Sequence, residues 1–95
     1  VMTGGWSLPK PATPEIQHIT NKVKLQFEVR ANRKPDLFIA IIYRSQVVAG
    51  TNYLIKVQVA ATEYVHLKVF VGLPPQDECP ALVSFETGKT KDDPL

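Results

Sequence analysis

The chain contains 95 residues, of which 44% are hydrophobic and 21% charged, and its formal net charge at pH 7 is +2. A chain of this length has room for one domain with a single two-layer core, and so small a charge excess argues against a nucleic-acid-binding protein. The apolar runs are far shorter than the roughly 20 residues of a membrane span and no targeting segment is recognisable, so we expect a cytoplasmic protein that binds neither nucleic acid nor membranes.

Residues 1–12 are expected to form a flexible leader, because glycine and proline are too frequent there for regular structure. A helix is predicted to follow, since Thr13 can cap it and Pro14 suits its first position. Apolar residues then recur at helical spacing on one face, at Ile16, Ile19, Val23 and Phe27. The helix is expected to end near Asn32, before Pro35 prevents its continuation.

Beyond the helix the apolar period changes to two residues, which predicts antiparallel strands. Four strands are expected, at residues 37–47, 51–59, 64–71 and 81–87. The first is apolar on both faces, whereas the third places Val65, Leu67, Val69 and Val71 on one face only. The polar residues 88–95 are expected to fray. The chain therefore predicts an α+β fold, in which a single long helix packs on a wrapped antiparallel β-sheet.

Three segments carry apolar or small residues where a turn or a chain end is ordinarily polar. They are the leader residues Val1, Met2, Thr3, Gly4 and Gly5, the hairpin residues Gln46, Val47, Val48, Ala49 and Gly50, and Leu73 and Pro74 after the third strand. In a meander the two hairpins close the same end of the sheet, and the leader reaches that end if the helix begins near the first hairpin. Together they would form an apolar wedge suited to a cleft.

The residues available for catalysis form no recognisable constellation. For His18 the only carboxylate three or four residues away is Glu15, and the same-face neighbours of His66, Tyr64 and Lys68, would not orient a base. The single cysteine, Cys79, lacks a neighbouring cation that would activate its thiol. One cysteine and two distant histidines do not give zinc spacing, so we expect neither a metal nor another cofactor. A lone cysteine also fits a reducing compartment. An enzyme that depends on Cys79 paired with a histidine stays open as a minor alternative.

Four segments of the chain resemble the cystatin family. The run Gln46-Val47-Val48-Ala49-Gly50 is similar to the family signature, and its setting between Ser45 and Thr51 resembles the stefins, the intracellular single-domain branch. The other matching segments are Pro11–Gln17, His66–Phe70 with Leu73-Pro74 after it, and Lys91-Asp92-Asp93. The resemblance implies one stefin-type domain over residues 1–95 with the cystatin-like fold.

The resemblance also implies a function, which is tight, reversible, competitive inhibition of papain-like cysteine proteases, with lysosomal cathepsins as typical targets. It assigns protease contacts to all three apolar segments, Val1 to Gly5, Gln46 to Gly50, and Leu73 with Pro74. Gly4 would be a hinge that lets the leader occupy the non-primed subsites of the protease. The first hairpin would fill the cleft beside the catalytic cysteine, and the second would rest on the primed side.

Two questions stay open at this point. The chain is expected to be a monomer, but a domain-swapped dimer that forms by opening of the first hairpin is an alternative. A non-inhibitory binding module or swapping scaffold with the same fold is the alternative function, with partners engaged through the apolar first strand.

Overall fold

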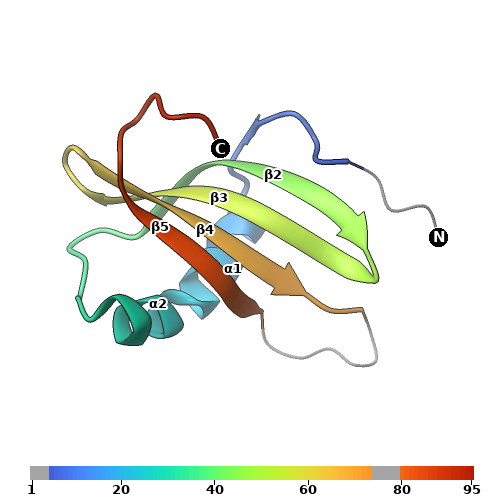
Figure 1. The fold of residues 1–95 in the computed structure, drawn as a ribbon, viewed down its shortest axis with the longest axis horizontal. Coiled ribbons are helices and arrows are strands. Elements are labelled where there is room, and N and C mark those ends of the chain that lie inside the picture. Colours follow the sequence, from blue (N-terminus) through green and yellow to red (C-terminus); the bar gives the residue numbers. More distant parts are fainter. Residues whose placement is uncertain (1–4, 74–79) are drawn as a thin grey trace.

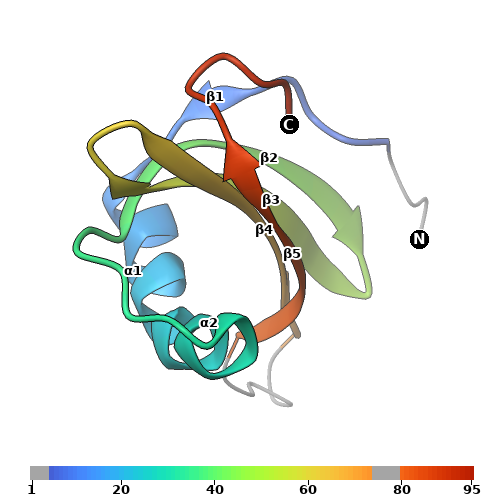
Figure 2. The ribbon, with the colours of Figure 1, turned by 60° about the vertical axis from the view of Figure 1, so that its left-hand side comes forward.

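The computed structural model of the protein describes residues 5–73 and 80–95 (Figure 1). Five strands form one antiparallel sheet in the order β1-β2-β3-β4-β5, and it curves around two helices (Figure 2). The elements are β1 (Lys10–Pro11), α1 (Pro14–Lys22), α2 (Lys24–Ala31), β2 (Ile39–Val48), β3 (Gly50–Ala60), β4 (Glu63–Val71) and β5 (Ala81–Lys89). The predicted α+β class and the wrapped antiparallel sheet are confirmed. Neither helix has the length and apolar character needed to cross a membrane.

The helical layer begins and ends as predicted but is divided in the middle. The Thr13 hydroxyl accepts a hydrogen bond from the backbone N–H of Ile16 at 3.2 Å, and Asn32 ends α2 with a left-handed φ of 55°. Between α1 and α2, Val23 has φ −99° and ψ 1°. The Thr20 hydroxyl donates to the carbonyl of Ile16 at 2.8 Å, a back-bond that bends helices. The expected single helix is thus two helices meeting at a kink.

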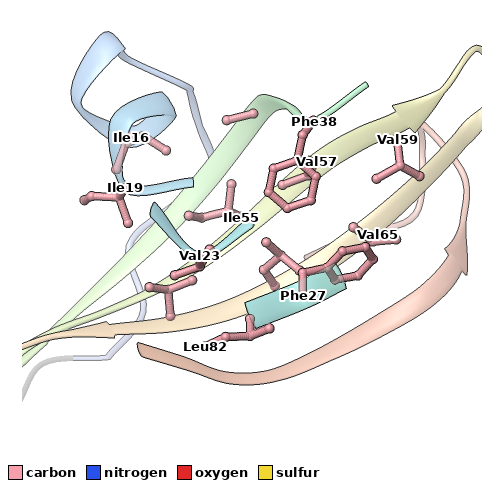
Figure 3. Packing of buried hydrophobic residues seen from close by; sticks show 13 residues of the cluster. Ile16, Ile19, Val23, Phe27, Phe38, Ile55, Val57, Val59, Val65 and Leu82 are labelled. Carbon is pink, nitrogen blue, oxygen red and sulfur yellow. The ribbon is translucent and has the colours of Figure 1, made fainter. Parts of the chain in front are cut away.

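The core lies between the helices and the concave face of the sheet (Figure 3). The predicted alternation is confirmed, because six residues of the two central strands are fully buried: Ile55, Val57, Val59, Val65, Leu67 and Val69. The ring of Phe27 in α2 packs between Phe38, just before β2, and Phe85 of β5, on opposite sides of the sheet. Its ring centroid lies 5.5 Å from that of Phe38 and 5.3 Å from that of Phe85, the second pair in an edge-on arrangement.

Two glutamine side chains from the helices bond the outer backbone of the sheet. The amide of Gln17 in α1 donates to Phe38 O at 3.0 Å and accepts from Ala40 N at 2.8 Å. The amide of Gln26 in α2 does the same on β5, where it donates to Pro80 O at 3.0 Å and accepts from Leu82 N at 2.9 Å. Each amide thus supplies the donor and acceptor that a neighbouring strand would supply, and blocks further pairing there.

The chain before the helix runs along the outer edge of β2. Lys10 pairs with Tyr43 and Pro11 with Ile42, and Ala12 N donates to Ile41 O at 3.0 Å. The expectation of irregular structure throughout residues 1–12 therefore does not hold at β1, which gains its backbone partners from β2. Residues 1–4 lie outside the described part of the chain.

The polar tail does not fray as expected but folds over the convex face of the sheet. Lys56 of β3 points away from the core, yet it is only 2% exposed, because its ammonium group donates to Lys91 O and Asp93 O, both at 2.6 Å. His66, its cross-strand partner on β4, is buried beneath the same segment. A charged side chain is seldom buried without such partners, so Lys56 is the anchor of the tail.

Candidate functional site

The first hairpin closes through one residue, Ala49, with Val48 paired directly to Gly50. Gly50 has φ +118°, which residues with a side chain rarely adopt. A Cβ atom at this position would lie 2.5 Å from Val71 O and 2.8 Å from Cζ of Phe70. Glycine therefore both permits the turn and lets the hairpin approach β4, so that the two segments form one surface.

The side chains of this hairpin tip differ in exposure. Val47 is 58% exposed and Ala49 is exposed, whereas Val48 is half-buried. Gln46 is held by the side-chain amide of Asn52, whose nitrogen donates to Gln46 Oε1 at 3.2 Å. Among the five residues predicted for this contact, Val47 and Ala49 thus offer the most accessible apolar surface.

The second predicted contact lies next to the first. Thr51 pairs with Val71 at the end of β4, and Leu73 follows two residues later with 58% of its surface exposed. The turn of β2–β3 and the end of β4 occupy the same end of the sheet, as expected (Figures 1 and 2). Pro74 and Cys79 lie outside the described residues.

The leader reaches this end by a different route from the one expected. The helix begins near the opposite end of β2, since the Gln17 side chain bonds Phe38 and Ala40. The leader instead runs antiparallel along β2, and its Ser7 N donates to Ser45 O at 2.8 Å. Gly5 is exposed at the start of the described chain, and the predicted residues Val1, Met2, Thr3 and Gly4 precede it.

Burial raises the pKa of Tyr53, which pairs with Ser45 near this end, and the other groups with shifted pKa values lie farther away. Burial lowers the pKa of His66, and the charges of Lys56 and Lys89 lower it further. The Arg33 guanidinium, which donates to Glu63 at 2.6 Å, holds the pKa of that carboxyl below its usual range. No pair of shifted groups at the described wedge end is arranged as an acid and a base, so what the arrangement offers is shape and apolar contact.

The convex-face cluster of Lys56 and His66 was not predicted as a pair. Both residues occupy outward positions in the alternation, which ordinarily means solvent exposure. His66 lines a hollow of about 210 Å³, together with Leu54, Lys68 and Ser84. The partners of Lys56 are backbone carbonyls, which leave no signal in a sequence.

Comparison with known proteins gives extensive similarity. A family model described as cystatin domain matches residues 4–92. The chain is 55% identical over 95 residues to leukocyte cysteine proteinase inhibitor 1 of Sus scrofa, covering 100% of this chain and 92% of the relative. It is 50% identical over 95 residues to cystatin-A of Homo sapiens, with 100% and 97% covered. It is 49% identical over 92 residues to stefin-C of Bos taurus, with 97% and 91% covered.

Proposed function

The chain belongs to the cystatin family, in its stefin branch, and from this premise we propose that it is a tight, reversible, competitive inhibitor of papain-like cysteine proteases. Members of this family inhibit proteases and are not enzymes, and relatives of this chain carry the names cysteine proteinase inhibitor and cystatin. The proposed targets are lysosomal cathepsins. The proposed contacts are Val1 to Gly5, Gln46 to Gly50, and Leu73 with Pro74.

The observation that carries the proposal is the convergence of apolar segments at one end of the sheet. Val47 and Leu73 are each 58% exposed. The backbone at Gly50, after Val47, lies against the backbone of Val71, which precedes Leu73. Contiguous exposed apolar residues mark interaction sites, and a convex ridge complements a concave cleft. Because the β2–β3 hairpin is already held by strand pairing, little conformational entropy of this segment is lost on binding.

The proposed mechanism is steric occlusion. The apolar wedge, which comprises the three proposed contact segments, fills the cleft and excludes substrate. It does so without placing a peptide bond against the catalytic cysteine, so no acid, base or metal is required of the inhibitor. Burial of one Val or Leu side chain in the cleft contributes about 1.5–3 kcal/mol. Several such contacts on a preorganised ridge are sufficient for tight binding.

The direct test is a titration of papain with the folded protein, measured by the hydrolysis of a fluorogenic peptide. Inhibition should be near-stoichiometric at nanomolar enzyme, should weaken as substrate rises, and should leave the inhibitor intact by mass spectrometry. Failure of a folded sample to inhibit at micromolar concentration would exclude the proposal. Progressive cleavage with recovery of activity would exclude the occlusion mechanism.

The contacts are tested by charge substitutions with matched controls. Val47→Asp and Leu73→Asp should each weaken binding by about 2 kcal/mol, or roughly 30-fold in Kd. Val29→Asp and Leu25→Asp introduce the same side chain on α2, where these residues are 73% and 69% exposed. The two α2 variants should inhibit as well as the unmodified protein, and equal losses in all four would contradict this placement of the site.

We further propose that the inhibitor is a cytoplasmic monomer. The single cysteine supports a reducing compartment, and the closed β2–β3 hairpin is needed for the ridge. A domain swap through this hairpin would extend it and remove the tip. Size-exclusion chromatography of the inhibitory fraction should therefore give the monomer mass, and inhibition by a dimeric fraction alone would contradict this part of the proposal.

A further inference from the structure

The leader is fastened to β2 at one residue beyond the β1 pairing. Ser7 N donates to Ser45 O at 2.8 Å, and Ser45 N donates to the Ser7 hydroxyl at 3.0 Å. The third bond comes from Arg44, whose Nε donates to Ser7 O at 2.8 Å. Both polar backbone groups of Ser7 and its hydroxyl thus have partners on β2.

Arg44 binds a second chain segment at the same time. Its Nη1 donates to the backbone oxygen of Leu95 at 3.0 Å, so that one guanidinium bonds both the leader and the tail to β2. The donors of a guanidinium are fixed in one plane, and two bonds to different segments therefore restrain the side chain and both segments together. A lysine has no such planar fork.

The position of Ser7 decides where the preceding chain begins. Lys10 pairs with Tyr43 in antiparallel register, so the chain from Lys10 back to Gly5 advances along β2 toward Val47. Three residues before Ser7 span at most about 10 Å, at roughly 3.5 Å per residue. If Ser7 were released, the nearest fixed point would be Lys10, and the free chain before it would be three residues longer.

We propose that Arg44 is a positioning residue for protease binding, which holds the leader at Ser7 so that the chain before Gly5 starts beside the Val47–Gly50 hairpin. This inference rests on the proposed function, because it assigns the restraint a role only when a protease occupies the wedge end. A tethered segment binds more strongly when its tether is short and correctly directed. Arg44 therefore acts through the leader and makes no contact with the protease itself.

The test is a four-protein cycle against papain, with dissociation rates measured after displacement by excess active-site inhibitor. The proteins are the unmodified chain, Arg44→Met, a chain that lacks residues 1–4, and the truncated chain with Arg44→Met. In the full chain, Arg44→Met should speed dissociation about three- to tenfold, because the leader is no longer preorganised. In the truncated chain the same substitution should change the rate less than twofold.

Two further variants separate positioning from general loosening of the fold. Arg33→Met removes another half-buried arginine, which pairs with Glu63 at the opposite end of the sheet, and should leave the dissociation rate unchanged. Ser7→Ala removes the hydrogen bond from Ser45 N to the Ser7 hydroxyl and leaves Arg44 in place. It should show a smaller increase in the dissociation rate, which also disappears on truncation. Urea denaturation of each protein confirms that the compared samples are folded.

The outcomes distinguish this inference from the proposed function. If Arg44→Met speeds dissociation equally with and without residues 1–4, the effect is structural and the inference is wrong. If the unmodified chain inhibits papain but truncation changes nothing, the leader does not contribute and the inference is again wrong, while the proposed function stands. If the unmodified chain does not inhibit at all, the proposed function itself fails.

Discussion

Replacement of Gly50 by alanine tests the construction of the hairpin tip. The first cost is conformational, because a residue with a side chain at φ +118° loses about 1–2 kcal/mol relative to glycine. The second is steric, since the new Cβ would lie 2.5 Å from Val71 O. That neighbour is backbone, so either the tip or β4 must move, at a cost of about 1–3 kcal/mol. We expect Gly50→Ala to lower the free energy of unfolding by about 3 kcal/mol.

Gly88→Ala supplies the matched control. Gly88 also has positive φ, +69°, but a Cβ there would meet no atom within 4 Å. It should lose only the conformational part, about 1 kcal/mol. In urea denaturation followed by circular dichroism, Gly50→Ala should lower the midpoint by about 2 M, given a slope of about 1.5 kcal/mol/M, and Gly88→Ala by less than half as much. Equal midpoints for the two variants would refute the steric argument.

Three further predictions concern the rest of the sheet. Burial lowers the pKa of His66, so the unfolded state binds more protons than the folded state between that pKa and 6.5. Stability should therefore fall on acidification through this window. In urea denaturation from pH 7.5 to 5, the free energy of unfolding should depend less on pH in His66→Gln than in the unmodified protein. Lys56→Met should free the tail at a cost of about 2 kcal/mol, seen as faster amide exchange in residues 90–95, and unchanged exchange would contradict the anchor. Gln26→Leu should cost about 2 kcal/mol and cause concentration-dependent association in light scattering, whereas a stable monomer would show that the amide does not protect the edge of β5.

The sequence predicts those features that arise from local periodicity. Val65, Leu67 and Val69 alternate with polar residues, and the structure buries all three against the helices. The helix start follows from Thr13 and Pro14, whose side chains act on neighbouring backbone alone. The position of a turn at Gly50 is likewise local, because few residues other than glycine accept its backbone angles.

The features that the sequence does not predict depend on contacts between distant backbone groups. Lys56 occupies an outward position, which ordinarily means solvent exposure, but the tail brings two carbonyls to it. β1 exists because β2 offers it unpaired backbone, and neither Lys10 nor Pro11 favours a strand by itself. Both of these outcomes are decided by tertiary structure, which the residue pattern does not contain. The kink at Val23 has a local cause in the Thr20 back-bond, but no glycine or proline marks it in the sequence.

The wedge end combines two kinds of residue, and they should respond differently to substitution. Val47 and Leu73 are exposed and contribute nothing to the core, so their loss should weaken protease binding without lowering stability. Gly50 positions the hairpin through its close approach to β4, and Arg44 positions the leader through its hydrogen bond to Ser7 O. The β2–β3 hairpin is ordered before binding, which avoids the entropic cost of assembling this segment in the cleft. Under the proposed mechanism, tight inhibition would depend as much on the residues that position these segments as on those that touch the protease.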